Sequence, residues 1–249
     1  MSTRAAHAAQ LGLLEDATGN HAAWRVRASD RARRLTVRVF PGGDVEIVVP
    51  NGTSPRAVEL FVARYRLWID RKVAQYRPLA AGNSDELPAT VRFQASGDCW
   101  RIDYIEAQGA PHLSVDGNRL LLIGDLSRIA LARHALQRFT MRMAHSILVP
   151  QLERLAAESG LHYSTAQIRR QRTRWGSCSR RGTISLNACL MFQPPDIVRY
   201  LLLHELAHTR HMNHSRRFWA LVEQLEPRWR ELDTGLSQGW REVPAWVLR

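Results

Sequence analysis

Cysteine is scarce in this sequence, and long apolar runs are missing. The 249 residues include three cysteines, Cys99, Cys178 and Cys189, whose odd number and scattered spacing exclude a disulfide framework and a C-x-x-C metal knuckle. We expect reduced, mostly buried thiols. No apolar run approaches the roughly 18 residues needed to cross a bilayer. Glu15 and Asp16 interrupt the N-terminal segment, which therefore lacks the apolar stretch of a signal peptide, so we expect a cytoplasmic protein without membrane association.

Lysine is almost absent: Lys72 is the one lysine among 35 basic residues, and the others are arginine. Against 23 acidic residues they give a net charge of +12. Such basicity is typical of proteins that bind polyanions, but a solvated arginine surface spread along the chain would have the same composition. The apolar content of 45% excludes wholesale disorder, and the length allows one large domain or two small ones.

The first third of the chain predicts a hairpin followed by a helix. Apolar alternation over 35–40 and 45–50, around a Pro-Gly-Gly-Asp turn, is typical of two antiparallel strands. Ser54 and Pro55 predict the start of a helix that runs to residue 76. The apolar positions that recur there at helical spacing are Leu60, Ala63, Leu67 and either Val73 or Ala74.

The middle of the chain predicts more strands and a long helix. A connection over 78–89 leads to three short strands, expected at 90–95, 99–106 and 112–123 with turns at 109–111 and 116–118. Ser127 opens a helical pattern that Pro150 should kink or break and Gly160 should end.

The last third predicts two strands and a helical hairpin. The strands are expected at 166–175 and 183–192, joined by a turn in GSCSRRGT, and a helix capped near Asp196 follows them. Ser215 predicts the start of the next helix, and Pro227 separates a last short one.

These patterns predict an α+β fold in which a β-rich N-terminal part precedes a core of helices and a small sheet. We expect four regions along the chain. They are a flexible tail over 1–20, a β-rich region with one helix over 21–125, a metal-binding catalytic region over 126–236 and a C-terminal tail over 237–249.

The sequence His204-Glu205-Leu206-Ala207-His208 carries the strongest chemical signal. Two histidines at i and i+4 on one helix lie one above the other and reach a single Zn²⁺, and the glutamate between them can act on water at that ion. A catalytic zinc site needs a third protein ligand and one open position.

His211 and His214 are the candidates for the third ligand. On a continued helix His211 would lie about 10 Å along the axis from His204, too far for one ion. His214 reaches the site if the chain turns back after His208, which a left-handed Asn213 and a new helix from Ser215 would permit. The spacing from His204 to His214 equals that in the H-E-x-x-H-x-x-G-x-x-H metalloprotease motif. We therefore predict one Zn²⁺ held by His204, His208 and His214, with Glu205 as general base.

A second cluster combines arginine with an aromatic residue and a thiol. Its six arginines occur between 169 and 181 without an acidic residue: Arg169, Arg170, Arg172, Arg174, Arg180 and Arg181. They fit either an exposed edge hairpin or a strand beside the metal that holds an extended or anionic substrate. Within this region Arg174, Trp175, Cys178 and Asn187 are candidate substrate-binding residues; packing is the alternative role for Trp175 and Cys178, and support of the hairpin for Asn187.

The segments RWGSC (174–178), ISLN, and HELAHTRHMNHSRRFW (204–219) together resemble the YgjP-like metallopeptidase family, relatives of the SprT-like and WLM-type zincins. The resemblance is strongest over 165–226 and extends more loosely to the N-terminal hairpin. It implies a zincin-like mini-metallopeptidase core, an active-site helix packed by a small sheet. It also implies zinc-binding roles for His204, His208 and His214 and a general-base role for Glu205.

A zinc-dependent peptidase acting on peptides or proteins is thus the leading functional hypothesis. A metal-dependent nucleotide pyrophosphatase, with the arginines holding phosphates, is the first alternative. A basic nucleic-acid-binding module, or a protease directed at DNA-associated proteins, is the second.

Overall fold

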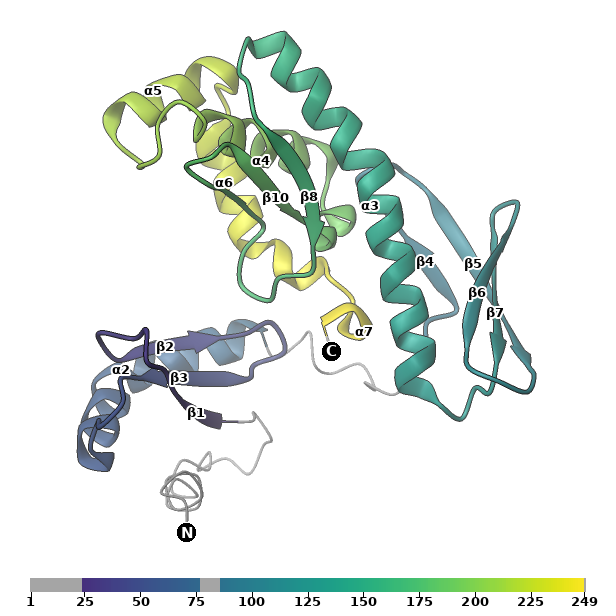
Figure 1. The fold of residues 1–249 in the computed structure, drawn as a ribbon, viewed down its shortest axis with the longest axis horizontal. Coiled ribbons are helices and arrows are strands. Elements are labelled where there is room, and N and C mark those ends of the chain that lie inside the picture. The colour runs from purple at the N-terminus through teal and green to yellow at the C-terminus, as the bar shows by residue number, and fades with distance from the viewer. Residues whose placement is uncertain (1–23, 77–85, 249) are drawn as a thin grey trace. The chain divides into compact units, whose positions relative to one another are not determined.

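A computed structural model describes residues 24–76 and 86–248, which fall into two compact units on either side of a division between residues 83 and 84 (Figure 1). The expected tail over 1–20 and most of the 78–89 connection lie outside the described residues. The expected regional boundary near 125 falls inside the second unit, because the strands before it pack on the long helix after it. Within the described ranges, no helix combines the length and apolarity required to cross a membrane.

The N-terminal unit is a three-stranded sheet with one helix on it. Strands β1 (Trp24–Ala28), β2 (Thr36–Val39) and β3 (Val45–Val49) have the order β1-β3-β2, with β1 parallel and β2 antiparallel to β3. Helix α2 (Pro55–Tyr76) follows. The predicted hairpin and the predicted bounds of this helix are confirmed.

The face of α2 that packs on the sheet is not the one formed by most of the apolar positions that indicated the helix. Its buried positions are Val58, Val62, Ile69 and Val73, whereas Leu60 and Leu67 are 64% and 75% exposed. Both sets recur at helical spacing on opposite sides of the helix, so periodicity alone does not identify the core face. Of the apolar positions that indicated the helix, Val73 is buried, while Leu60, Ala63 and Leu67 are exposed.

The C-terminal unit begins with a four-stranded sheet of order β4-β5-β7-β6. The strands are β4 (Thr90–Arg92), β5 (Cys99–Glu106), β6 (His112–Asp116) and β7 (Arg119–Gly124). The predicted run 112–123 is thus two strands around the expected turn at 116–118, where Gly117 has φ 56°. Cys99 on β5 is exposed, Cys178 is partly buried and Cys189 is buried, so the expectation of mostly buried thiols is wrong for Cys99.

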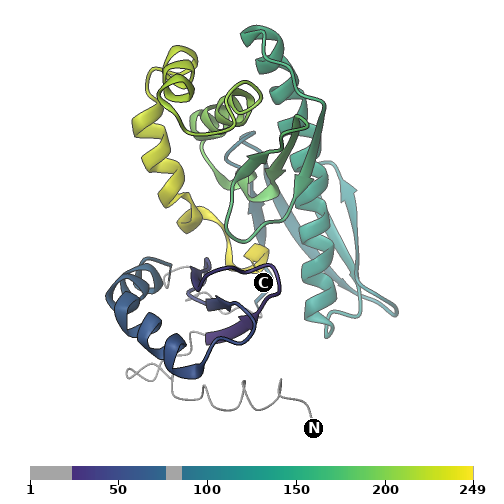
Figure 2. The same cartoon turned by 60° about the vertical axis from the view of Figure 1, so that its left-hand side comes forward.

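Helix α3 (Ile129–Ser159) runs along this sheet in both views (Figures 1 and 2). Phe139 of α3 contacts Phe93 and Trp100, with ring centroids 6.0 and 5.4 Å apart. Of the predicted kink or break at Pro150, the break does not occur, because the helix continues through the proline. The fully buried Leu148 and Leu152 hold it on both sides of Pro150. Gly160 ends it in the predicted left-handed conformation.

A second sheet supports the site. Its strands β8 (Thr165–Arg169), β10 (Thr183–Asn187) and β9 (Gly176–Cys178) have the order β8-β10-β9, with β10 parallel to β8 and antiparallel to β9. The predicted strands 166–175 and 183–192 are too long. Residues 170–175 form a connection, Gly176–Cys178 is a strand rather than part of a turn, and 188–192 is the short 3₁₀ helix η3 (Ala188–Phe192).

Helical elements complete the unit: α4 (Pro195–Ala207), α5 (Arg216–Leu225), α6 (Trp229–Gln238), η4 (Gly239–Glu242) and α7 (Ala245–Leu248). The segment expected as a C-terminal tail packs into the core. Trp240 stacks on Trp175 with centroids 4.1 Å apart, and the Gln137 side chain on α3 donates to the carbonyl of Trp246 at 2.8 Å. Burial of its apolar side chains explains why this segment is ordered.

Candidate metal centre

Three histidines converge at the end of α4. Potential ligand nitrogens of His204, His208 and His214 all lie within 4.8 Å of one another, and the Nε2 atoms of His204 and His214 are 3.2 Å apart. His204 lies in the last turn of α4 and His208 is its C-cap. Neither His211 nor Cys178 belongs to this cluster.

The chain turns back directly after His208, as a role for His214 requires. Successive backbone bonds from Thr209 to Leu206 and from Arg210 to Ala207 close tight turns at the helix end. Ser215 then caps α5, its hydroxyl accepting from the Phe218 amide. Asn213 does not adopt the left-handed conformation that would have permitted the turn, since none of the described non-glycine residues has a positive φ. The tight turns after His208 reverse the chain instead.

Neighbouring groups determine which nitrogen of each α4 histidine faces the centre. His208 Nδ1 lies 3.0 Å from the His211 carbonyl, which only accepts, so Nδ1 carries the proton and Nε2 keeps its lone pair. Tyr200 donates its hydroxyl proton to Asp233 Oδ1 at 2.8 Å, and its oxygen lies 3.4 Å from His204 Nδ1. That oxygen is therefore free to accept from His204 Nδ1.

His214 is supported by aromatic rings. Its imidazole stacks on Trp219 with centroids 5.5 Å apart and meets Phe218 edge to face at 4.8 Å. Phe218 also stacks on His208 at 4.5 Å and meets His204 edge to face at 4.9 Å, so one buried ring contacts all three histidines. Trp219 in turn stacks on Trp229 of α6 at 4.3 Å.

The electrostatics favour neutral imidazoles. Burial, reinforced by repulsion from His208 and His214, lowers the pKa of His204 to about 3. Burial also lowers the pKa of His208. Neutral imidazole is the form that binds metal, so the three-nitrogen donor set and the lowered pKa values of His204 and His208 fit a divalent cation such as zinc.

Glu205 is buried on the adjacent side of α4, beneath strand β9. Its side-chain Oε2 has no hydrogen-bond partner among the described residues. Burial raises the pKa of Glu205 to about 8, while the positive charge of Arg174 opposes the shift. A Cβ atom at Gly176 would lie 2.6 Å from Glu205 Oε1, so glycine is what allows β9 to approach this carboxyl group.

The other predicted site residues are Asn187 and Trp175, which hold and pack the connection before β9, and Cys178, which lies near Glu205. Asn187 is buried, and its amide donates to the carbonyls of Gln171 and Arg174, both at 2.7 Å, so it clamps the connection before β9. Trp175 is buried against Trp240. Burial, with a further contribution from Glu205, raises the pKa of the Cys178 thiol to about 11.

Sequence reasoning did not identify Tyr200 or Asp233. Tyr200 precedes His204 by four residues and so shares its helix face, a signal that the sequence does contain. Asp233 comes from α6 and has no local signal, because only the packing of α6 on α4 brings it to Tyr200.

Comparisons with known proteins identify the family of this chain. No curated protein matches the chain. A solved structure, the crystal structure of the metallopeptidase zymogen of Pyrococcus abyssi abylysin, is 28% identical over 35% of this chain and 89% of that chain, with a TM-score of 0.33. The model of the YgjP-like metallopeptidase domain matches residues 33–238, which include the three histidines, Glu205 and both sheets of the C-terminal unit. The chain therefore belongs to the YgjP-like metallopeptidase family.

Proposed function

We propose that this chain is a zinc-dependent peptidase, with one Zn²⁺ held by His204, His208 and His214 and Glu205 as the general base. The observation that supports it is the convergence of three imidazoles next to a buried, unpartnered carboxyl oxygen. Three nitrogen ligands with one open position are the donor set of catalytic zinc sites. Zinc bound there supplies Lewis acidity, which acidifies water and polarises a carbonyl group.

Glu205 would hold and transfer the proton. Its raised pKa, about 8, is close to neutral pH, where a carboxylate serves both to accept a proton from water and to return it to a leaving amine. Its Oε2 is the atom available for this role, since none of the residues that the structure describes forms a hydrogen bond with it.

Strand β9 would hold the substrate. It pairs with β10 on one side only and forms an edge of its sheet, and Gly176 brings it against Glu205. An extended peptide can pair with such an edge through backbone hydrogen bonds. The exposed Arg174 beside the carboxyl group adds a positive charge at the same position.

The test compares Glu205→Gln and His214→Ala with the wild-type protein, using elemental analysis and a fluorogenic peptide mixture. Glu205→Gln should retain about one zinc per chain and lose turnover by about 10²–10⁴-fold, because the proton acceptor is gone. His214→Ala should lose most of the zinc. Unchanged turnover in Glu205→Gln would reject the mechanism, and equal zinc in His214→Ala would reject the ligand set.

Nucleoside triphosphates should be assayed in parallel, because the exposed arginines near 169–181 also suit phosphate. Turnover of a triphosphate without turnover of any peptide would assign the same centre to the pyrophosphatase alternative. Peptide turnover alone would exclude it.

A further inference from the structure

The described part of the N-terminal unit, residues 24–76, is strongly basic and contains none of the three clustered histidines. Residues 24–76 include eleven arginine and lysine residues against five acidic ones, a net charge of +6, which is half of the net charge of the whole chain. The question is whether these charges are spread evenly or gathered on one surface.

Successive side chains of a strand point to opposite faces, so the apolar core and the charged residues lie on opposite faces of this sheet. Alternate residues of β3, among them Ile47 and Val49, pack with Val58 and Val62 of α2. Glu46 therefore points to the opposite face, where the strand register places Arg25 of β1 and Arg38 of β2 directly beside it.

Glu46 gathers three guanidinium groups on this face. Its carboxyl oxygens lie 3.2 Å from Arg25, 3.4 Å from Arg27 and 3.7 Å from Arg38. The glutamate is buried, while the three arginine side chains remain 59%, 47% and 49% exposed. One carboxylate leaves this group with a net charge of +2, and each guanidinium has five donors, so donors remain directed to solvent.

The connection between β1 and β2 adds further positive charge beside this group of arginines. It crosses the end of β3, where the Ser29 amide donates to the Val49 carbonyl at 2.9 Å and Asn51 bonds Asp30. Arg27, opposite Val48, lies next to this end. The connection also carries three exposed arginines, Arg31, Arg33 and Arg34.

We propose that this surface binds the phosphodiester backbone of a nucleic acid. We name it the basic face and define it as Arg25, Arg27, Arg31, Arg33, Arg34 and Arg38. Guanidinium groups suit phosphate because they present paired donors, and Glu46 holds three of them in place before any ligand binds. Six cations on a sheet and its flanking loop fit a repeating anion better than a single one.

The chemistry of this face favours nucleic acid over a lipid surface. Interfacial membrane binding needs apolar side chains inserted among the headgroups. Among the described residues of this unit, the exposed large apolar side chains are all on α2: Leu60, Tyr65, Leu67 and Trp68. The basic face as defined contains no aromatic residue for base stacking, so we expect contacts to phosphate and little dependence on sequence.

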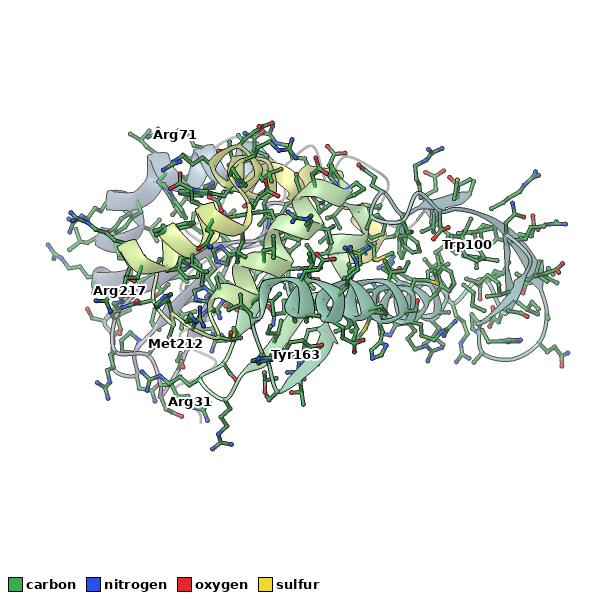
Figure 3. The ribbon with its side chains drawn as sticks, turned by 90° about the horizontal axis from the view of Figure 1, so that it is seen from above. Arg31, Arg71, Trp100, Tyr163, Met212 and Arg217 are labelled. Carbon is green, nitrogen blue, oxygen red and sulfur yellow. The ribbon has the colours of Figure 1, made fainter. Side chains whose placement is uncertain are left out.

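The test uses full-length protein and two matched triple variants. Arg31→Gln/Arg33→Gln/Arg34→Gln removes three charges from the basic face and leaves the partners of Glu46 intact. Arg56→Gln/Arg64→Gln/Arg71→Gln removes three exposed charges from α2 of the same unit. Figure 3 shows Arg31 and Arg71 on opposite sides of this unit. Circular dichroism melts check that both variants fold.

Binding of fluorescein-labelled DNA and RNA oligonucleotides, single-stranded and duplex, is followed by anisotropy between about 50 and 200 mM salt. The basic-face variant should bind about tenfold more weakly and show a log–log salt slope shallower by up to about 3 for duplex DNA. The α2 variant should bind nearly as well as the wild type.

Three outcomes would overturn the proposal. The first is that the wild-type protein binds no oligonucleotide at low salt, and the second is that both triple variants lose oligonucleotide binding equally. The third is that the protein binds phosphatidylserine vesicles but no oligonucleotide, and that only the α2 variant loses the vesicle binding. Glu205→Gln should bind oligonucleotides normally, which keeps this test independent of the proposed peptidase activity.

Discussion

At the residue scale, the two α4 histidines differ in what holds them. A backbone carbonyl holds His208, whereas His204 depends on the hydroxyl of Tyr200, which is itself bonded to Asp233. Burial and the bond to Asp233 raise the pKa of Tyr200, so its hydroxyl keeps its proton at physiological pH. Asp233 is therefore a positioning residue that acts on His204 through Tyr200.

Asp233→Asn should weaken zinc binding by about 10–100-fold, the usual cost of disturbing such a support, because a neutral amide oxygen accepts the Tyr200 hydroxyl less strongly than the carboxylate does. A chromogenic zinc chelator in competition with the protein measures the change, and Tyr200→Phe should have the same effect. Asp196→Asn, which removes a surface partner of Arg228, is the control for loss of charge. Equal zinc affinity in Asp233→Asn and the control would show that this carboxylate only stabilises the fold.

The residues that sequence reasoning identified are those whose chemistry is encoded in local spacing. The i, i+4 histidines and the third histidine ten residues on are readable because a helix and a turn convert spacing into distance. The supporting role of Asn187 is not, because its partners Gln171 and Arg174 reach it only when the strands pair.

At the scale of elements, the close approach of β9 to α4 requires a residue without a side chain, Gly176, opposite Glu205. In Gly176→Ala, the added Cβ would lie 2.6 Å from Glu205 Oε1 and 2.9 Å from its Cδ. The carboxyl group must shift, and a displacement near 1 Å costs about 10²-fold in rate at a catalytic group. We expect turnover of the fluorogenic peptides to fall by about that factor while zinc content stays near the wild-type value.

The control for this prediction is Gly160→Ala. It strains a left-handed helix cap at φ 66° far along the chain from Glu205 and costs stability of about 1 kcal/mol. If it reduces turnover as much as Gly176→Ala does, general destabilisation explains both results and the close approach of β9 is not the cause.

Elements with local start and stop signals were predictable. Pro55 begins α2, Gly160 ends α3 and Ser215 caps α5, each through its own backbone or side-chain geometry. The sequence predicts strand over 170–175, but the Asn187 amide donates to two carbonyls of this connection, those of Gln171 and Arg174. Tertiary hydrogen bonds of this kind override local propensity.

At the scale of the whole molecule, the two units have separate cores and, as proposed, separate tasks. Ile47 belongs to an N-terminal cluster with Val49, Val58 and Val62. Ile184 is fully buried on β10 in the C-terminal unit, opposite Cys178 of β9. Replacing either isoleucine with alanine removes the same side-chain atoms, in one case from the N-terminal core and in the other from the C-terminal core.

Ile47→Ala should cost about 2–5 kcal/mol, which is comparable to the total stability of about 3–8 kcal/mol expected for a unit of this size. Hydrogen exchange of the full chain should therefore rise across 24–76 and remain unchanged across 86–248. Oligonucleotide binding should fall while zinc content is retained. Ile184→Ala should raise hydrogen exchange in 86–248, and it should reduce zinc retention more than it reduces oligonucleotide binding. A rise in exchange across both units from Ile47→Ala alone would show that the chain unfolds as one cooperative body, and the division of tasks between the units would then be rejected.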